Sequence, residues 1–104
     1  MEFQRIVFRT NKHNRYSITA LVGAILSRID IDVIESKSIS DILQYPVEGT
    51  VVAYSFMSFD IDIVKVEVQE LKKHGYIIIA GGPHATALPQ ETLKIGFDYV
   101  FTGD

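Results

Sequence analysis

The sequence contains no cysteine and no tryptophan. Without cysteine, the chain cannot form disulfides, use a cysteine nucleophile, or bind zinc or an iron–sulfur cluster through thiolates. This composition is compatible with a cytoplasmic protein, which is the location we expect. No run of about 18 apolar residues is present, so no membrane partner is expected. The first five residues also lack the order of a signal peptide.

An excess of positive charge is missing as well. Ten Lys and Arg residues against thirteen Asp and Glu residues give a formal charge of −3, so nucleic acid is not an expected partner. The chain has 104 residues, of which 47% are hydrophobic and 22% charged. These values exclude a disordered tail and predict a single domain with one core, spanning residues 1–104.

Short β-rich runs alternate with helix-like segments along the chain. A helical period of apolar residues begins near Tyr16. A capping box at Ser38 predicts the start of a short helix, which Pro46 ends. Pro89 suits the first position of a later helix. Strands are predicted at residues 3–8, 31–34, 50–56, 76–80 and 97–101.

Residues 60–74 fit two patterns. Their apolar residues match both a strand period of two and a helical face. We favour a helix because the segment is about fifteen residues long, has basic residues in its last turn and is followed by Gly75. A crossover is also needed here if the flanking strands are parallel.

The resulting order predicts an α/β, flavodoxin-like (Rossmann-like) fold. Its five parallel strands would take the order 2-1-3-4-5 with right-handed crossovers. This arrangement is expected to lack its final helix, which predicts a fragment of a longer polypeptide. The alternative is a small protein that forms a homo-oligomer through the uncovered sheet face.

In such a sheet, ligands bind beyond the carboxyl ends of the strands. Three predicted loops lie there, at residues 9–15, 55–60 and 81–88. Gly81, Gly82 and Pro83 can form a flat shelf for a planar group or a phosphate, or simply a tight turn. Ser55 can bond a ligand from the pocket floor, or cap the next helix, for which Ser58 and Asp60 are the stronger candidates.

The two loop histidines, His13 and His84, are candidate metal ligands or proton shuttles, and the simpler reading of each is a solvated side chain. His74 is most simply a partner of a helix dipole. The sequence has no Walker motif, no Rossmann glycine fingerprint and no nucleophile elbow. The first strand ends without an acidic cluster, which disfavours a phospho-acceptor receiver domain.

Three segments resemble the cobalamin (vitamin B12)-binding domain at the N-terminus of B12-binding radical S-adenosylmethionine (SAM) enzymes. In that family a Gly-Gly-Pro-His segment follows the fourth strand, and a Phe-Asp-Tyr-Val segment leads toward the catalytic half. The matching segments here are YSFM at residues 54–57, AGGPHAT at residues 80–86 and FDYVFTGD at residues 97–104.

The resemblance implies roles for individual residues. Ser55, with Met57 two residues on, matches the position that bonds the benzimidazole tail of cobalamin. Gly81 and Gly82 match the glycine pair that leaves room for that tail, with Pro83 and His84 completing the motif. In a related branch, a histidine after the first strand binds cobalt. The corresponding stretch here contains Asn11 and His13, but asparagine replaces the family's aspartate and Tyr16 its glycine.

The resemblance therefore implies a cobalamin-binding module that holds the corrin at the carboxyl ends of the strands. The domain alone would have no catalytic activity. SAM and a 4Fe–4S cluster would belong to a downstream radical SAM domain, with His13 as a candidate cobalt ligand. Two alternatives stay open: a degenerate Rossmann-like docking domain that binds no cobalamin, and a small flavin or nucleotide carrier.

Overall fold

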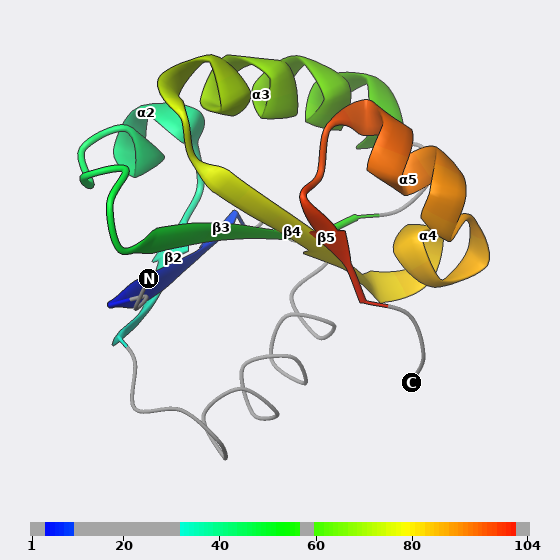
Figure 1. Cartoon of the computed structure of the whole chain (residues 1–104), viewed down its shortest axis with the longest axis horizontal. Helices are drawn as coiled ribbons and strands as arrows, with labels where there is room; N and C mark the ends of the chain where they lie inside the picture. Colours follow the sequence, from blue (N-terminus) through cyan, green and yellow to red (C-terminus); the bar gives the residue numbers. More distant parts are fainter. Residues whose placement is uncertain (1–3, 10–31, 57–59, 102–104) are drawn as a thin grey trace.

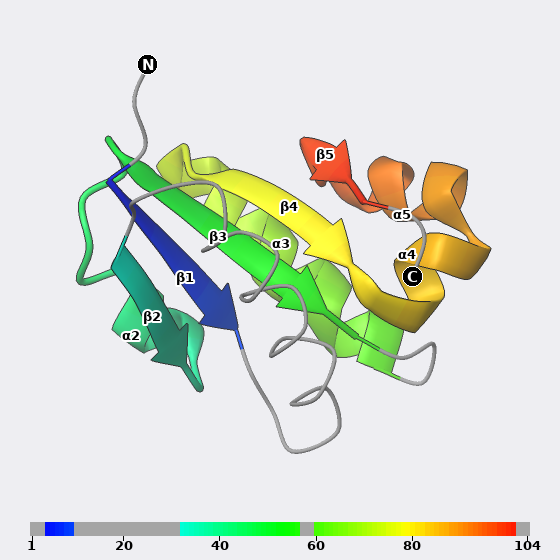
Figure 2. The same ribbon diagram turned by 90° about the horizontal axis from the view of Figure 1, so that it is seen from below.

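The computed structural model describes residues 4–9, 32–56 and 60–101, with only the backbone of residues 82–84. Its parallel strands form one five-stranded sheet in the order β2-β1-β3-β4-β5 (Figure 2). Both the flavodoxin-like fold and the strand order predicted from the sequence are confirmed. The strands are β1 (Arg5–Arg9), β2 (Asp32–Ser36), β3 (Thr50–Ser55), β4 (Ile77–Gly81) and β5 (Tyr99–Val100).

Four helices are described, and their bounds follow local sequence signals. They are α2 (Ile39–Ile42), α3 (Ile61–His74), α4 (Gly82–Ala87) and α5 (Pro89–Ile95). Ser38 caps α2 by accepting a hydrogen bond from the Asp41 backbone nitrogen at 3.3 Å. Pro89 occupies the start of α5 as predicted. The helix predicted from Tyr16 onward lies outside the described residues.

The ambiguous segment is a helix, as predicted. Val64, Val68 and Leu71 in α3 are buried at helical spacing. Gly75 ends the helix with a φ of 94°, a left-handed conformation that glycine adopts without a steric penalty. Asp60 takes the N-cap position of α3, but its side chain makes no capping hydrogen bond.

The region after β4 differs from the prediction. Residues 81–88 were expected to form a loop, but Gly81 is the last residue of β4 and α4 begins at Gly82. Pro83 is compatible with this because a helix makes no use of the N–H groups of its first turn. Neither glycine is among the described glycines with a positive φ, so this pair does not use the left-handed conformation that glycine allows.

The sheet has two differently covered faces. Helices α2, α3 and α5 lie on one side of it, which we call the helix face (Figure 1). The main core forms there, and the alternation of side chains along each strand sends a second set of apolar residues to the opposite face. That second cluster comprises Ile6, Phe8, Val51, Ala53 and Ile79, with Val33 packed against it.

Among the described residues, no helix combines the length and the apolar character needed to cross a membrane. The strands are apolar along most of their length, as expected for parallel strands covered on both faces. The rings of Tyr54 and Phe56, at the carboxyl end of β3, contact the ring of Phe97, which lies between α5 and β5, with centroids 5.8 Å apart for Tyr54–Phe97 and 5.9 Å for Phe56–Phe97. These ring contacts pack the carboxyl end of β3 against the segment that leads into β5.

Candidate functional site

The carboxyl edge of the sheet brings together residues that lie far apart in the sequence. In the strand register, Arg9 pairs with Tyr54, and Ser55 pairs with Gly81. These positions end β1, β3 and β4, on both sides of the point where the strand order reverses. Open α/β sheets bind their ligands at such a point.

Ser55 and Gly81 lie on the opposite face of the sheet. Side chains alternate along a strand, and Ala53 and Ile79, two residues earlier on the same strands, belong to the cluster of that face. Ser55 is only 1% exposed, and Gly81 is also buried. A small hydroxyl side chain therefore sits beside a position with no side chain at all, within the buried end of the sheet.

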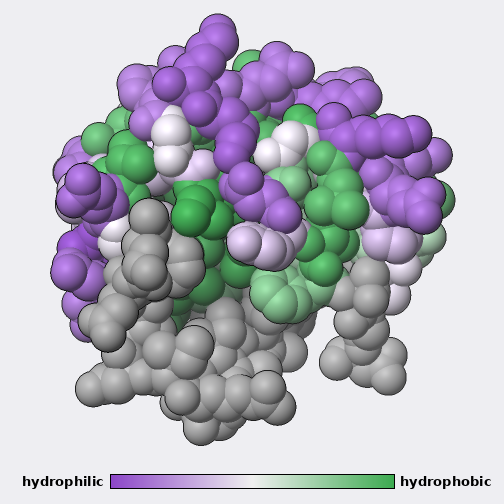
Figure 3. Space-filling view, in the orientation of Figure 1, coloured by the Kyte–Doolittle hydropathy of each residue, from purple (hydrophilic) through white to green (hydrophobic). Residues whose placement is uncertain are grey.

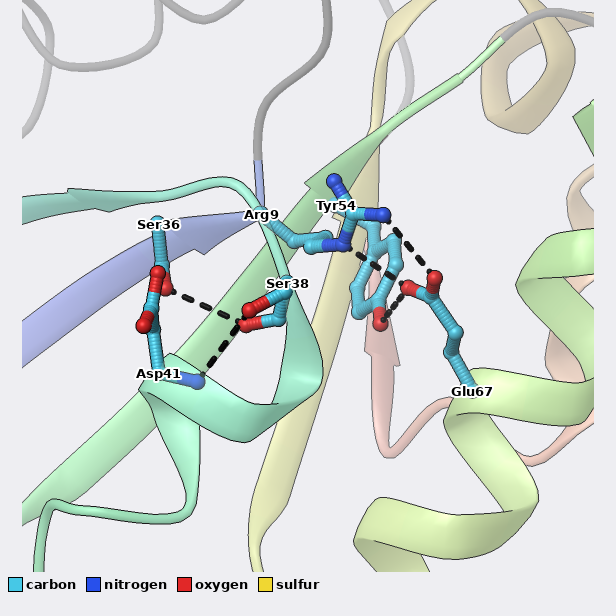
Figure 4. A network of polar contacts seen from close by, with 6 residues as sticks. All are labelled: Arg9, Ser36, Ser38, Asp41, Tyr54 and Glu67. Carbon is cyan, nitrogen blue, oxygen red and sulfur yellow. Dashed lines mark hydrogen bonds and ion pairs between the residues drawn. The ribbon is translucent and has the colours of Figure 1, made fainter.

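On the helix face, a charged network joins β1, β3 and α3 (Figure 4). The guanidinium of Arg9 donates from Nε to Glu67 Oε1 and from Nη2 to Glu67 Oε2, each at 2.9 Å. The hydroxyl of Tyr54 donates to the same Glu67 Oε1 at 2.8 Å. Two-point contact between a guanidinium and a carboxylate is among the stronger polar contacts in proteins.

The network is mostly shielded from water. The side chains of Arg9 and Glu67 are 17% and 14% exposed. Burial raises the pKa of the Tyr54 phenol far above its ordinary value of 10.0, and the neighbouring Glu67 carboxylate raises it further. Tyr54 therefore stays a neutral hydrogen-bond donor at physiological pH and does not serve as a base.

A cavity of about 190 Å³ lies against this network. Three of its walls are the network residues themselves. Phe56, Ile63 and Val64 supply apolar surface, and Asp60 adds a second carboxylate. Because Arg9, Tyr54 and Phe56 come from the ends of β1 and β3, the cavity sits at the reversal point of the strand order.

Polar groups also gather at the end of β2. Ser36 Oγ donates to the backbone oxygen of Ser38 at 3.2 Å, and the Ser38 side chain caps α2 (Figure 4). Both contacts are local. They fix the turn from β2 into α2. The polar contacts of Ser36 and Ser38 are thus explained by local structure, and no ligand is needed to explain them.

The structure brings together only part of the set predicted from the sequence. Ser55 and Gly81 are side by side, and Gly82, Pro83 and His84 form the first turn of the adjacent α4. Met57, Asn11 and His13 lie outside the described residues. Within the described ranges, no group of three or more His, Asp or Glu side chains is arranged to hold a metal ion.

The sequence analysis missed the network of Arg9, Tyr54 and Glu67. Arg9 was assigned to a loop but ends β1. One sequence signal pointed to Glu67: this residue lies on the same helical stripe as the buried Val64, Val68 and Leu71. A charged residue within an apolar stripe predicts a buried partner, although it does not identify that partner.

The chain was compared with known proteins. It is similar to a solved structure described as the N-terminal domain of the hypothetical protein TM0182 from Thermotoga maritima. The two share 50% sequence identity over 90% of each chain, with a TM-score of 0.68. No family model matches the chain, and no curated protein does.

Proposed function

This chain belongs to the family of the N-terminal domain of TM0182 from Thermotoga maritima, and we propose that it serves as the cobalamin-binding module of a B12-dependent radical SAM enzyme. Its role would be to hold the corrin at the carboxyl ends of the strands. When bound, cobalamin supplies a cobalt ion that can carry a methyl group or exchange electrons. The chain's own residues would bind and orient the corrinoid.

The pairing of Ser55 with Gly81 is the observation that carries this proposal. A flat benzimidazole tail needs a narrow slot and one polar partner to orient it. Gly81 has no side chain, so a slot of this kind would lie beside β4 at this position. Ser55 would bring a hydroxyl to the same slot from β3, and both residues are buried.

The rest of the enzyme is part of the proposal. The relative is described as an N-terminal domain, which supports a further domain after this one in the family. That downstream domain would contain the 4Fe–4S cluster and SAM, because this chain has no cysteine. His13 remains a candidate cobalt ligand. Replacing it with alanine should change the visible spectrum of bound cobalamin, and an unchanged spectrum would remove His13 from that role.

A second candidate function is docking without cobalamin. Tyr99 and Phe101 are 61% and 52% exposed at the β5 edge of the sheet. Figure 3 shows hydrophobic residues gathered between the hydrophilic helical surface and the residues in grey. Exposed apolar surface of this kind favours contact with another protein or with a second copy of the chain.

A direct experiment separates the two candidates. Purified protein is mixed with hydroxocobalamin and desalted, and its visible spectrum is recorded. The binding module should retain corrinoid colour close to one equivalent, whereas the docking domain should retain none. A parallel sample with flavin mononucleotide tests the flavin alternative, and we expect no retained flavin.

Two variants and a matched control test the slot. Gly81→Val should abolish cobalamin retention by filling the slot, and Ser55→Ala should weaken it about tenfold, the effect of losing one oriented hydrogen bond. Thr50→Val also removes a buried hydroxyl from β3, but at the amino end of the strand. It should leave retention unchanged. Circular dichroism checks that each variant is folded.

A further inference from the structure

A groove of about 410 Å³ lies between α3 and α5. The two helices contact each other and lie side by side over the helix face (Figure 1). The groove shares no lining residue with the cavity beside Arg9, Tyr54 and Glu67. Its lining comprises Ile61, Lys65 and Gln69 from α3, and Glu91, Lys94 and Ile95 from α5. The three residues of α3 are spaced four apart and therefore form one row along the helix.

The groove combines an apolar floor with charged rims. Ile61 and Ile95 are half-buried and pack against the main core, whereas Lys65, Glu91 and Lys94 are exposed. Within the part of the chain that the structure describes, none of these three charged side chains forms an ion pair. The groove thus has two ammonium groups and one carboxylate around an apolar floor. This lining suits a segment that presents an apolar side chain next to negative charge.

A complementary row lies next to the groove row on α3. Asp62, Val66 and Glu70 are also spaced four apart, each one residue after a member of the groove row. Val66 and the nearby Ile63 are 68% and 62% exposed, the two highest values among the large hydrophobic residues described. Glu70 forms ion pairs within its own helix, whereas none is described for Asp62. We call the row of Asp62, Val66 and Glu70 the α3 ridge, and it combines exposed apolar surface with negative charge.

We propose that the chain forms a two-fold symmetric dimer in which the α3 ridge of each copy occupies the groove between α3 and α5 of the other. In an antiparallel pair of α3 helices, the register that places Asp62 opposite Lys65 also places Val66 opposite Ile61. The two-fold axis repeats both contacts, so the interface contains two ion pairs and two apolar contacts. Lys94 of α5 adds positive charge beside the entering ridge.

A second copy suits the groove better than an unrelated protein, because both halves of the contact are present on one helix. Exposed ion pairs add little to affinity, but like charges brought together repel, so the charged residues select the register. The paired segment is short, which predicts a small interface and a weak dimer. The contact uses neither Ser55 nor Gly81, so it does not rest on cobalamin binding.

Exchanging the charges tests the register. Dissociation constants are measured by sedimentation velocity over a concentration series. Lys65→Glu turns both ion pairs into repulsive contacts and should weaken the dimer about tenfold or more. Asp62→Lys should do the same, although it makes the chain less negative and so reduces general repulsion. In an equimolar mixture of the two variants, each reversed charge meets an opposite one, and the dissociation constant should return to within about threefold of wild type.

A matched control separates this contact from general charge effects. Lys37→Glu makes the same change as Lys65→Glu at an exposed residue between β2 and α2, outside the groove lining. It should alter the dissociation constant less than about twofold. Circular dichroism checks that each variant is folded.

Three results overturn the dimer proposal. The first is wild-type protein that stays monomeric at every concentration. The second is a dimer that Lys65→Glu and Lys37→Glu weaken equally, because the copies then meet through another surface, such as the β5 edge. The third is a mixture of the Lys65→Glu and Asp62→Lys variants that remains monomeric. Each of these results leaves the proposed function standing, since cobalamin retention is measured separately.

Discussion

The two faces of the sheet differ sharply at its carboxyl edge. On the helix face, Tyr54 belongs to a buried charged network that ties β1 and β3 to α3. On the opposite face, the next residue, Ser55, pairs with a glycine. Large, hydrogen-bonded side chains thus stabilise the carboxyl edge of the sheet on the helix face. On the opposite face, the same edge has the small residues Ser55 and Gly81. Stability should therefore depend mainly on the helix face, and binding of the proposed cobalamin tail on the opposite face.

The largest effect is expected where the network is broken. Glu67→Ala leaves the guanidinium of Arg9 without its two-point partner in a mostly buried position, so unfolding should become easier by about 3 kcal/mol. Glu70→Ala is the control, because the ion pairs described for Glu70 are with the exposed Lys73 and His74 side chains of its own helix. Its effect should be about 0.5 kcal/mol or less. Urea unfolding measures both, and equal losses would contradict the anchoring role of the network.

A smaller effect is expected from the tyrosine. Tyr54→Phe keeps the ring and its edge contact with Phe97 but removes the hydrogen bond to Glu67. Hydrogen bonds to charged groups contribute about 1.5–3 kcal/mol, so the variant should lose about 2 kcal/mol. Tyr99→Phe removes a hydroxyl from a side chain that is 61% exposed and should change stability very little. If the two variants match in urea unfolding, the Tyr54 hydroxyl does not stabilise the fold.

The same tyrosine predicts how stability changes at high pH. Burial raises the pKa of Tyr54 above 10.0, and burial also raises the pKa of Tyr76, whose hydroxyl donates to the backbone oxygen of Tyr45 at 2.5 Å. Above pH 10 the unfolded chain releases protons that the folded chain retains, so stability is complete below pH 10 and falls as the pH rises. Each tyrosine should contribute a slope of up to about 1.4 kcal/mol per pH unit.

Urea unfolding between pH 9 and pH 11 measures this slope, and the comparison is between wild type and Tyr54→Phe. The variant should show a shallower decline because one of the two groups no longer titrates. Parallel declines for the two proteins would mean that Tyr54 is not protected from ionisation in the folded state.

The sequence predicted the architecture well because the signals for it are local. Apolar runs identified the strands, and Gly75 and Pro89 marked a helix end and a helix start that the structure confirms. The error at residues 81–88 has a local cause too. Two glycines and a proline are typical of a loop, yet Pro83 also suits the first turn of a helix, and Ala85 packs into the core without exposed surface.

The site was only half predictable. Ser55 and Gly81 follow from strand ends and a short motif, and the parallel register then places them side by side. The partners of Glu67 could not be found in this way, because Arg9 is 58 residues away and Tyr54 is 13 residues away. Periodicity shows that Glu67 faces the core, but only the packing of α3 over β1 and β3 shows what it meets there.

The smallest expected effect on stability tests the other half of the comparison. Ser55→Ala removes a buried hydroxyl that is adjacent to Tyr54 in the sequence but lies on the opposite face. If this face is kept small for a ligand, the variant should lose less than about 1 kcal/mol in urea unfolding, since alanine fills nearly the same space. The same variant should nevertheless weaken hydroxocobalamin retention. A stability loss as large as that of Tyr54→Phe would show that Ser55 also stabilises the fold. The proposal that the helix face provides stability and the opposite face provides binding would then be wrong.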